Sequence, residues 1–302
     1  MSFFSLLSKI LPLYIIAIQG YIAGKLYEID TKSLSKLMFH FILPVIFFDV
    51  ALNTKIELKY AILPVICFTA SCALMGIGFY IASKLFNDGR ETVIAYAAGS
   101  VNTSSVGLSI VLLVFDDEHI RIFMLSSIGI VLFVYSVGYI VISSNTDSWK
   151  KMSYDLIRLP PIYAFIMGLC GNLFDIQLFD GFNHLFSQMR TTYLVLGMLV
   201  FGLSLSKVNF SVGKTFISLF IVLKTIISPG IYLLFILLDK FVLHIYDNEM
   251  YKLLFTISAL PTGVDCIVLC SLYHKHPEKA AVGVLIGTLI ATIYIPFFLQ
   301  FF

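Results

Sequence analysis

The chain has 302 residues, of which 59% are hydrophobic and 13% charged, and its mean hydropathy is +0.95. Soluble domains carry about 25% charged residues, so the composition excludes an ordinary soluble protein and predicts an all-α membrane protein. A net charge of +2 without a basic run gives no reason to expect nucleic acid as a partner.

Five apolar segments fill residues 1–142, and each approaches the length of about 20 helical residues that crosses a bilayer. They lie at 3–23, 37–52, 60–84 and 93–115, and the fifth follows the acidic turn at 116–119 and ends near residue 142. The first segment lacks a basic start and a cleavage site, so we interpret it as a membrane helix and not as a signal peptide.

Residues 143–158 are the longest polar stretch, and we expect a connecting loop there. The pattern then restarts, and residues 159–302 contain apolar segments at 159–174, 191–205, 214–238, 251–272 and 278–302. We therefore predict ten transmembrane helices in a single membrane domain made of two five-helix repeats. Because each repeat has an odd number of spans, the two repeats are expected to be inverted relative to each other.

The basic residues of the loops predict the orientation. Loops after the odd-numbered helices hold about twelve Lys and Arg residues, and those after the even-numbered helices hold about six. Basic loops favour the cytoplasm, so the loop at 143–158 is expected inside and both termini outside. The protein is expected to be an integral multi-pass protein of the plasma membrane (the inner membrane of the cell).

Two of the apolar segments are interrupted at corresponding places. Residues 99–107 of the fourth segment contain two glycines and five small polar residues. In the ninth segment Pro261 removes a backbone donor, and Gly263 follows two residues later. A shift of 159 residues lays Asn102 on Pro261 and Gly107 on Cys266.

Breaks of this kind predict a transport site. Each backbone group that a broken helix frees in hydrocarbon costs several kcal/mol unless protein or cavity water satisfies it. Broken helices in corresponding places of two halves therefore point to a substrate site near the bilayer midplane.

Asp265 follows the second break and is the strongest candidate for a functional side chain. A carboxylate at this depth has to be paired, protonated or in contact with water, which suits coupling to a proton or an ion. The alternative is a structural carboxylate that accepts hydrogen bonds from the broken backbone.

Lys224 is also expected to be buried. It could pair with Asp49 or Asp265, bind the carboxylate of a substrate, or extend its charge to the interface.

The remaining candidates are neutral. Half-helix amino ends and small polar side chains suit an anion, and the alternative is that these side chains only satisfy broken backbone bonds. His40 is expected to make an interhelical hydrogen bond, and Asp49 to cap its helix. With Asp265 and Lys224, the predicted substrate-binding residues are Asn102, Thr103, Ser104, Ser105, Pro261, Thr262, Gly263 and Gln19.

Neither a metal nor an enzymatic site is expected. The five cysteines all fall in apolar segments, which argues against a disulfide framework, and Cys266 and Cys270 lack a nearby third metal ligand. A phosphate-binding loop, paired catalytic carboxylates and a nucleophile elbow are all missing from the sequence.

The residues around both breaks resemble the sequence motifs of a known family. Residues 99–109 resemble the signature Gly-Asn-x-Gly-x-x-Gly-x-Pro, and residues 260–265 resemble Pro-Ser-Ala-x-Asn. Leu43-Pro44 and the segment at 271–273 continue the similarity. These motifs resemble those of the auxin efflux carrier family, which contains the PIN-FORMED auxin exporters and bacterial malonate or malate carriers.

The resemblance implies ten helices in two inverted repeats, with outward termini and with helices 4 and 9 crossing at the midplane. It implies elevator-type transport of a small organic acid, such as a carboxylate, an auxin-like acid or an amino acid. Asn102 and Asp265 stand at the family's two crossover asparagines. Asp265 departs from that pattern, as do Ser104 in place of glycine and Ser109 in place of proline.

Two alternatives stay open. The first is a sodium-coupled carrier resembling the bile acid:sodium symporters, in which unwound carbonyls and Asp265 hold Na⁺. The second is a transport-dead membrane sensor or scaffold. The expected partners are an organic acid substrate and the lipid bilayer, with a homodimer left open. No cofactor is expected apart from a coupling H⁺ or Na⁺.

Overall fold

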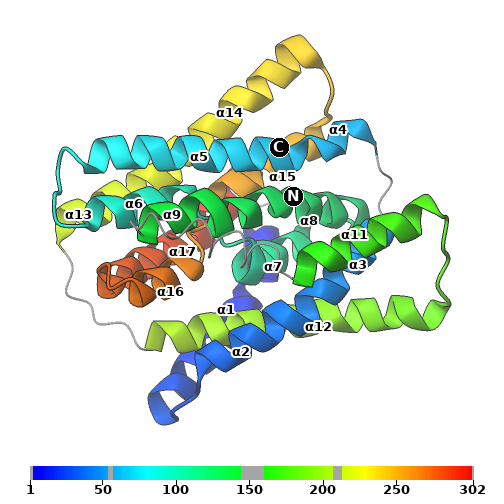
Figure 1. Cartoon of the computed structure of the whole chain (residues 1–302), viewed down its shortest axis with the longest axis horizontal. Coiled ribbons are helices and arrows are strands. Elements are labelled where there is room, and N and C mark those ends of the chain that lie inside the picture. Colours follow the sequence, from blue (N-terminus) through cyan, green and yellow to red (C-terminus); the bar gives the residue numbers. More distant parts are fainter. Residues whose placement is uncertain (1–2, 54–56, 144–159, 207–212, 301–302) are drawn as a thin grey trace.

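The computed structural model describes residues 3–53, 57–143, 160–206 and 213–300, and all regular structure in these ranges is helical. The predicted connecting loop at 143–158 lies outside the described residues, apart from Ser143. Figure 1 shows an elongated bundle in which most helices run roughly side by side.

The helices of the first half follow the predicted segments. They are α1 (Phe3–Leu26), α2 (Thr31–Leu37), the π-helical segment η1 (Met38–Ile42), α3 (Leu43–Asn53), α4 (Leu58–Ala61), α5 (Leu63–Ala82), α6 (Arg90–Gly99), η2 (Thr103–Gly107), α7 (Leu108–Val114), α8 (Asp117–Phe133), η3 (Val134–Gly138) and α9 (Tyr139–Ser143).

The second half has a corresponding order of helices. They are α11 (Pro160–Leu173), α12 (Asp180–Ser206), α13 (Lys214–Val222), η4 (Leu223–Ile227), α14 (Ser228–Leu238), η5 (Asp239–Leu243), α15 (Asn248–Ala259), α16 (Asp265–Leu272) and α17 (Pro277–Leu299).

Six helical runs in the described residues are long and apolar enough to cross a membrane. They are Ser33–Asn53, Lys59–Ala82, Asp117–Ser143, Gly181–Ser206, Lys214–Leu243 and Pro277–Leu299. Leu11–Leu26 and Pro160–Leu173 are apolar but shorter. The fourth and ninth predicted segments are each divided in two, as the sequence predicted, and neither half reaches the length of a span.

Several helices extend beyond their predicted limits. The second begins at Thr31 and not at residue 37, the seventh begins at Asp180 and not at 191, and the eighth continues to Leu243. The added turns carry charged and polar residues, which a search for apolar runs leaves out. A helix tolerates such residues where its end reaches the polar interface.

Close helix pairs divide the bundle into two groups. The first group is α1 with α12 and α3 with α11, and its helices meet at glycines. A Cβ added to Gly202 would lie 1.9 Å from the Ala17 carbonyl oxygen, and one added to Gly168 would lie 2.5 Å from that of Phe48. Small residues let membrane helices approach this closely. Figure 1 shows α1, α2 and α12 together at the lower edge.

The second group is built on α5, which packs along both α6 and α8. Gly129 of α8 lies so close to α5 that a Cβ there would be 1.9 Å from the Pro64 carbonyl oxygen. The helices α13 to α17 join this group through contacts of α17 with α13 and α15 and of α14 with α5.

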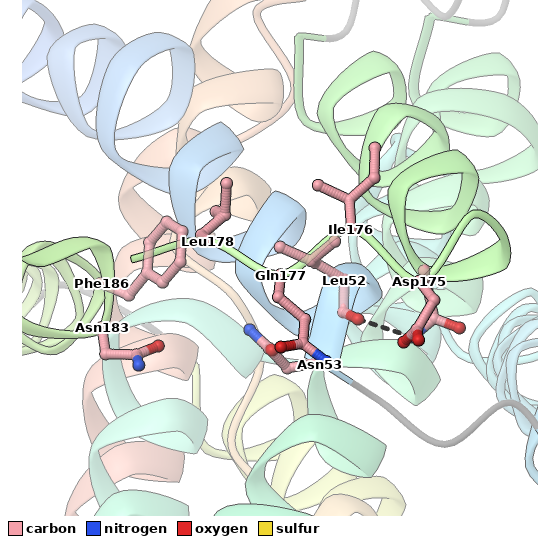
Figure 2. Close-up of a pocket in the computed structure, with 9 residues that line it drawn as sticks. Leu52, Asn53, Asp175, Ile176, Gln177, Leu178, Asn183 and Phe186 are labelled. Carbon is pink, nitrogen blue, oxygen red and sulfur yellow. Dashed lines mark hydrogen bonds between the residues drawn. The ribbon is translucent and has the colours of Figure 1, made fainter. Parts of the chain in front are cut away.

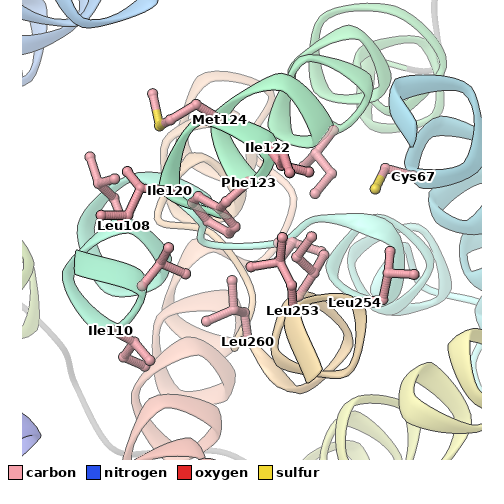
Figure 3. Packing of buried hydrophobic residues seen from close by; sticks show 14 of the residues in the cluster. Cys67, Leu108, Ile110, Ile120, Ile122, Phe123, Met124, Leu253, Leu254 and Leu260 are labelled. Atoms are coloured by element: carbon pink, nitrogen blue, oxygen red, sulfur yellow. The ribbon is translucent and has the colours of Figure 1, made fainter. Parts of the chain in front are cut away.

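An apolar core of the second group surrounds the places where α6 and α15 end. Leu108, Phe123 and Leu260 point toward one another in Figure 3, and Leu253 and Leu254 come from the neighbouring α15. All five side chains are buried. The backbone groups freed at the breaks are therefore shielded from lipid and depend on protein partners.

Candidate functional site

The first break begins where α6 ends at Gly99. A Cβ at this glycine would lie 2.5 Å from the Ser71 carbonyl oxygen and equally close to the Phe133 ring, so no larger residue fits. Residues 100–102 then leave the helix. Asn102 starts the second half-helix, because its carbonyl accepts the Gly107 amide at 2.8 Å and its side-chain oxygen accepts the Val106 amide at 3.4 Å.

The second break follows α15, which ends at Ala259 before Pro261. The Ser258 carbonyl, which a continuing helix would bond internally, accepts the Ser228 hydroxyl of α14 at 2.8 Å. A Cβ at Gly263 would lie 1.8 Å from an Asp265 carboxylate oxygen, so a larger residue here would displace that carboxylate. The helix restarts at Asp265.

The two breaks meet and satisfy each other. We call the place where residues 100–102 contact residues 260–263 the crossover. The Asn102 amide donates to the Pro261 carbonyl at 2.8 Å, and the Thr262 hydroxyl donates to the Ala97 carbonyl at 2.8 Å. The Gly263 amide donates to the Ser100 hydroxyl oxygen at 3.3 Å. Backbone groups that each broken helix frees are thus bonded by the other one.

Asp265 is held at the crossover by two hydroxyl groups of α6 and its end. Tyr96 and Ser100 both donate to the same carboxylate oxygen, the Ser100 bond measuring 2.9 Å. Tyr96 is completely buried, whereas Asp265 is only partly buried. Asp265 is therefore a structural acceptor that keeps some access to its surroundings.

Lys224 reaches the crossover from η4 and is 4% exposed. Its ammonium group donates to the Ser100 carbonyl at 2.5 Å and interacts electrostatically with Asp265. The backbone is irregular here because Pro229 lacks an amide hydrogen, and the Thr225 carbonyl four residues earlier accepts the Tyr294 hydroxyl at 2.8 Å instead. The alternative in which Lys224 extends to the interface is wrong.

The structure brings most of the predicted site residues together. Asn102, Pro261, Thr262, Gly263, Asp265 and Lys224 all lie at the crossover. Thr103 is partly buried and Ser104 exposed, and a hydrogen bond links Ser104 to Tyr193 of α12. The side chain of Ser105 is outside the described set. Gln19 is exposed on α1, and among the described residues it makes no hydrogen bond to the crossover.

The sequence reasoning missed Tyr96 and Ser100 as the partners of Asp265. The two residues are four positions apart, about one helical turn, so Ser100 follows Tyr96 on the same side at the end of α6. That spacing was visible in the sequence. Which residue of the other half they would face was not, because it depends on how the two breaks meet.

Asp49 has a different partner from those predicted. It does not reach Lys224 and does not simply cap its helix. It forms an ion pair with Arg190 of α12, accepts the Asn53 side-chain amide at 2.8 Å, and its side chain is 4% exposed.

His40 does not make the interhelical hydrogen bond that was expected. It is exposed, and its ring contacts the Lys36 carbonyl one turn earlier in the chain at 3.0 Å.

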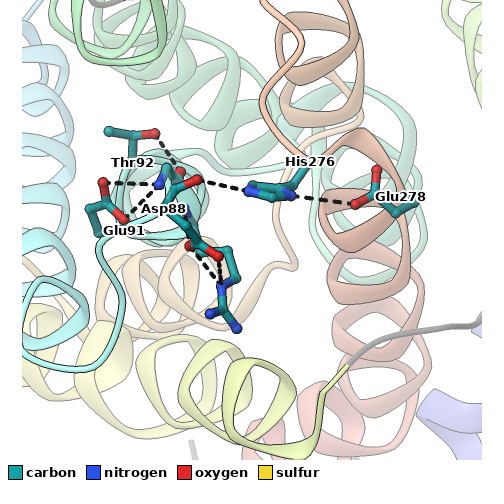
Figure 4. Close-up of polar contacts among 7 residues, drawn as sticks. Asp88, Glu91, Thr92, His276 and Glu278 are labelled. Carbon is teal, nitrogen blue, oxygen red and sulfur yellow. Dashed lines mark hydrogen bonds and ion pairs between the residues drawn. The ribbon is translucent and has the colours of Figure 1, made fainter.

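A polar cluster joins the outer ends of the two broken-helix regions (Figure 4). The ring of His276 bonds the Asp88 carbonyl oxygen at 3.0 Å and lies 3.5 Å from Glu278. The Arg90 side chain bonds Asp88 at 2.8 Å and holds the pKa of that carboxyl below its usual value. This cluster ties the start of α6 to the start of α17.

A surface pocket of about 280 Å³ lies elsewhere, between the end of α3 and the connection from α11 to α12 (Figure 2). Its lining includes Asn53, Asn172, Asp175, Gln177 and Asn183 but no crossover residue. Because none of its lining residues belongs to the crossover, this pocket is not the predicted site.

A comparison of the sequence with those of known protein families identifies the family to which the chain belongs. The profile of the family described as membrane transport protein matches residues 5–299, which is nearly the whole chain. The chain belongs to this family, that of the auxin efflux carriers. No curated protein sequence matches the chain significantly. Membership makes the protein an integral multi-pass membrane protein of a transporter family, and its helical fold and buried charged crossover are consistent with that.

Proposed function

We propose that the protein is a secondary active transporter of a small organic acid, such as a carboxylate, an auxin-like acid or an amino acid, and that the substrate binds at the crossover. The observation that carries the proposal is the meeting of two broken helices around a buried lysine and a carboxylate, Lys224 and Asp265. Charges at this depth are expensive, and transporters keep them where they bind a solute or an ion.

The proposed architecture is ten spans in two inverted repeats, with both termini outside. Two features support it. The breaks occupy corresponding positions in the two halves, and the order of helices before and after each break is the same. The six long runs together with the two shorter and two divided ones would supply the ten spans.

The proposed motion is a sliding of one helix group against the other. The group of α1, α3, α11 and α12 is locked by glycine contacts, and the crossover belongs wholly to the other group. Ser104 of the first break touches Tyr193 of α12, so the crossover faces the group against which it would move. Such a displacement would carry the site across the membrane.

Charge balance at the crossover suggests how coupling would work. A substrate carboxylate about 4 Å from an ionised Asp265 would be repelled by about 4 kcal/mol at an effective dielectric of 20. A proton on Asp265 would remove that repulsion and leave Lys224 without its counter-ion. The ammonium could then bind the substrate carboxylate, so proton and substrate would move together.

Transport by purified protein in proteoliposomes tests the proposal. We expect uptake of one or more radiolabelled organic acids, with a pH dependence that Asp265→Asn flattens. Lys224→Ala should weaken the binding of an anionic substrate far more than that of a neutral one. Asp88→Asn, which changes an exposed loop carboxylate, serves as the control and should leave the pH dependence unchanged.

Three results would contradict parts of the proposal. An unchanged pH dependence in Asp265→Asn would remove Asp265 as the coupling group. Equal loss of anionic and neutral substrates in Lys224→Ala would make the lysine structural. Absence of flux for every organic and amino acid tested would favour the sensor or scaffold alternative.

A further inference from the structure

Two oxygen-bearing groups, a backbone carbonyl and a carboxylate, lie side by side where α6 meets the crossover. The Ser100 carbonyl directly follows the C-terminal end of α6, where the helix dipole is negative. The Asp265 carboxylate is fixed beside it, because the Ser100 hydroxyl bonds one of its oxygens at 2.9 Å. Unwound carbonyls at half-helix ends, together with a carboxylate, are groups that coordinate small cations in transporters.

The ammonium group of Lys224 lies against the Ser100 carbonyl and makes no direct ion pair with Asp265. Its nitrogen lies 2.5 Å from the Ser100 carbonyl oxygen, and it interacts electrostatically with Asp265. The side chain is 4% exposed and comes from η4, a different helix from either broken one. A lysine in the middle of an apolar span has to be held by such partners, since solvent does not reach it.

We propose that the Ser100 carbonyl and the Asp265 carboxylate form a site for a monovalent cation, and that the covalently tethered Lys224 ammonium takes the place of that cation while Asp265 is ionised. The wild-type protein would then bind no Na⁺ at the crossover, and transport would be independent of Na⁺. A variant without the ammonium would instead bind Na⁺ there, because the same two oxygen groups are hard ligands and need a cation. The proposal deepens the proposed function but concerns binding alone.

Thermal unfolding of the purified full chain tests it without any substrate. Wild type and Lys224→Ala are compared in NaCl and in choline chloride at equal ionic strength, since choline is too large for the space that the truncated side chain leaves. We expect one melting temperature for the wild type in both salts. For Lys224→Ala we expect a rise of at least about 2 °C in NaCl, together with saturable binding of radiolabelled sodium.

Two further variants serve as controls. Lys252→Ala removes another poorly exposed lysine, which pairs with Glu249 at 3.5 Å on α15, and should show no sodium effect. The double variant Lys224→Ala/Asp265→Asn removes both charges of the site. It should fold and also show no sodium effect, because the carboxylate ligand is gone.

Three outcomes overturn the proposal. One is sodium binding by the wild type that Asp265→Asn abolishes, and another is a folded Lys224→Ala that responds equally to both salts. The third is a Lys224→Ala that fails to fold in either salt while the double variant folds, because sodium would then be unable to replace the ammonium. A sodium site that appears without any measurable transport supports the cation site and counts only against the proposed function.

Discussion

Replacing Thr262 by valine would remove one hydroxyl group from the crossover and keep the shape of the side chain. That hydroxyl donates to the Ala97 carbonyl at 2.8 Å, and Thr262 is completely buried. The bond joins the second break to the half-helix before the first one. Since α6 ends at Gly99, the next helical turn does not supply the Ala97 carbonyl with a backbone donor.

The expected loss in the free energy of unfolding arises because one buried carbonyl is left without a hydrogen-bond donor. An unsatisfied polar group of this kind costs about 1–3 kcal/mol, which exceeds the net value of an ordinary hydrogen bond. Each kcal/mol lowers the melting temperature of a chain of this size by about 2–4 °C. We therefore expect Thr262→Val to unfold about 2–12 °C below the wild type.

Thr288→Val is the matched control. Thr288 is also completely buried and donates at 2.8 Å, but to the Val284 carbonyl one turn earlier in its own helix, where the backbone already supplies a donor. Its loss should change stability by less than about 0.5 kcal/mol. A thiol-reactive fluorescent dye can follow unfolding in a background in which the exposed Cys170 and the partly exposed Cys72 are replaced by serine, because the free thiols of Cys67, Cys266 and Cys270 are buried in the folded protein.

Equal melting temperatures for the two variants would refute the reasoning. They would mean that the Ala97 carbonyl finds another donor, such as a water molecule, and that the crossover is not closed by mutual hydrogen bonds. A larger loss in Thr288→Val would place the sensitive packing in α17 instead.

Three further predictions concern packing, charge and pH. The first two are measured by the same unfolding assay, and the third by circular dichroism, because the dye reacts with thiolates, which are scarce in acid. Gly129→Ala forces a Cβ to 1.9 Å from a carbonyl of α5 and should destabilise strongly, whereas Gly76→Ala, with nothing within 4 Å, should gain about 0.5–1 kcal/mol. Arg190→Ala leaves Asp49 buried without its cation and should cost about 3–5 kcal/mol, and adding Asp49→Asn should recover part of that. The His119 backbone amide holds the pKa of Asp116, which caps α8, below its usual value. Its stabilisation is complete above about pH 4 and is lost as the pH falls through the folded-state pKa, so Asp116→Ala should cost about 1 kcal/mol at pH 7 and less in acid; a constant difference down to acidic pH would contradict this.

Local chemistry alone was enough to predict the two breaks. Proline lacks an amide hydrogen, and a run of glycine and small polar residues cannot maintain an apolar helix, so the interruptions near Pro261 and Gly99 were readable from the chain. The apolar composition likewise determined a helical membrane protein. Helix ends were less predictable, because charged turns such as that after Thr31 continue the helix beyond the apolar run.

Only the tertiary structure decided which groups meet. Asp265 could have faced Lys224, a broken backbone or water, and the fold gives it Tyr96 and Ser100 while Lys224 bonds the Ser100 carbonyl. Asp49 forms an ion pair with Arg190, and no pattern in the sequence had linked these two residues. These pairs join residues more than 120 positions apart, and such contacts depend on how helices pack, whereas helix formation and helix breaking depend on neighbours within one or two turns.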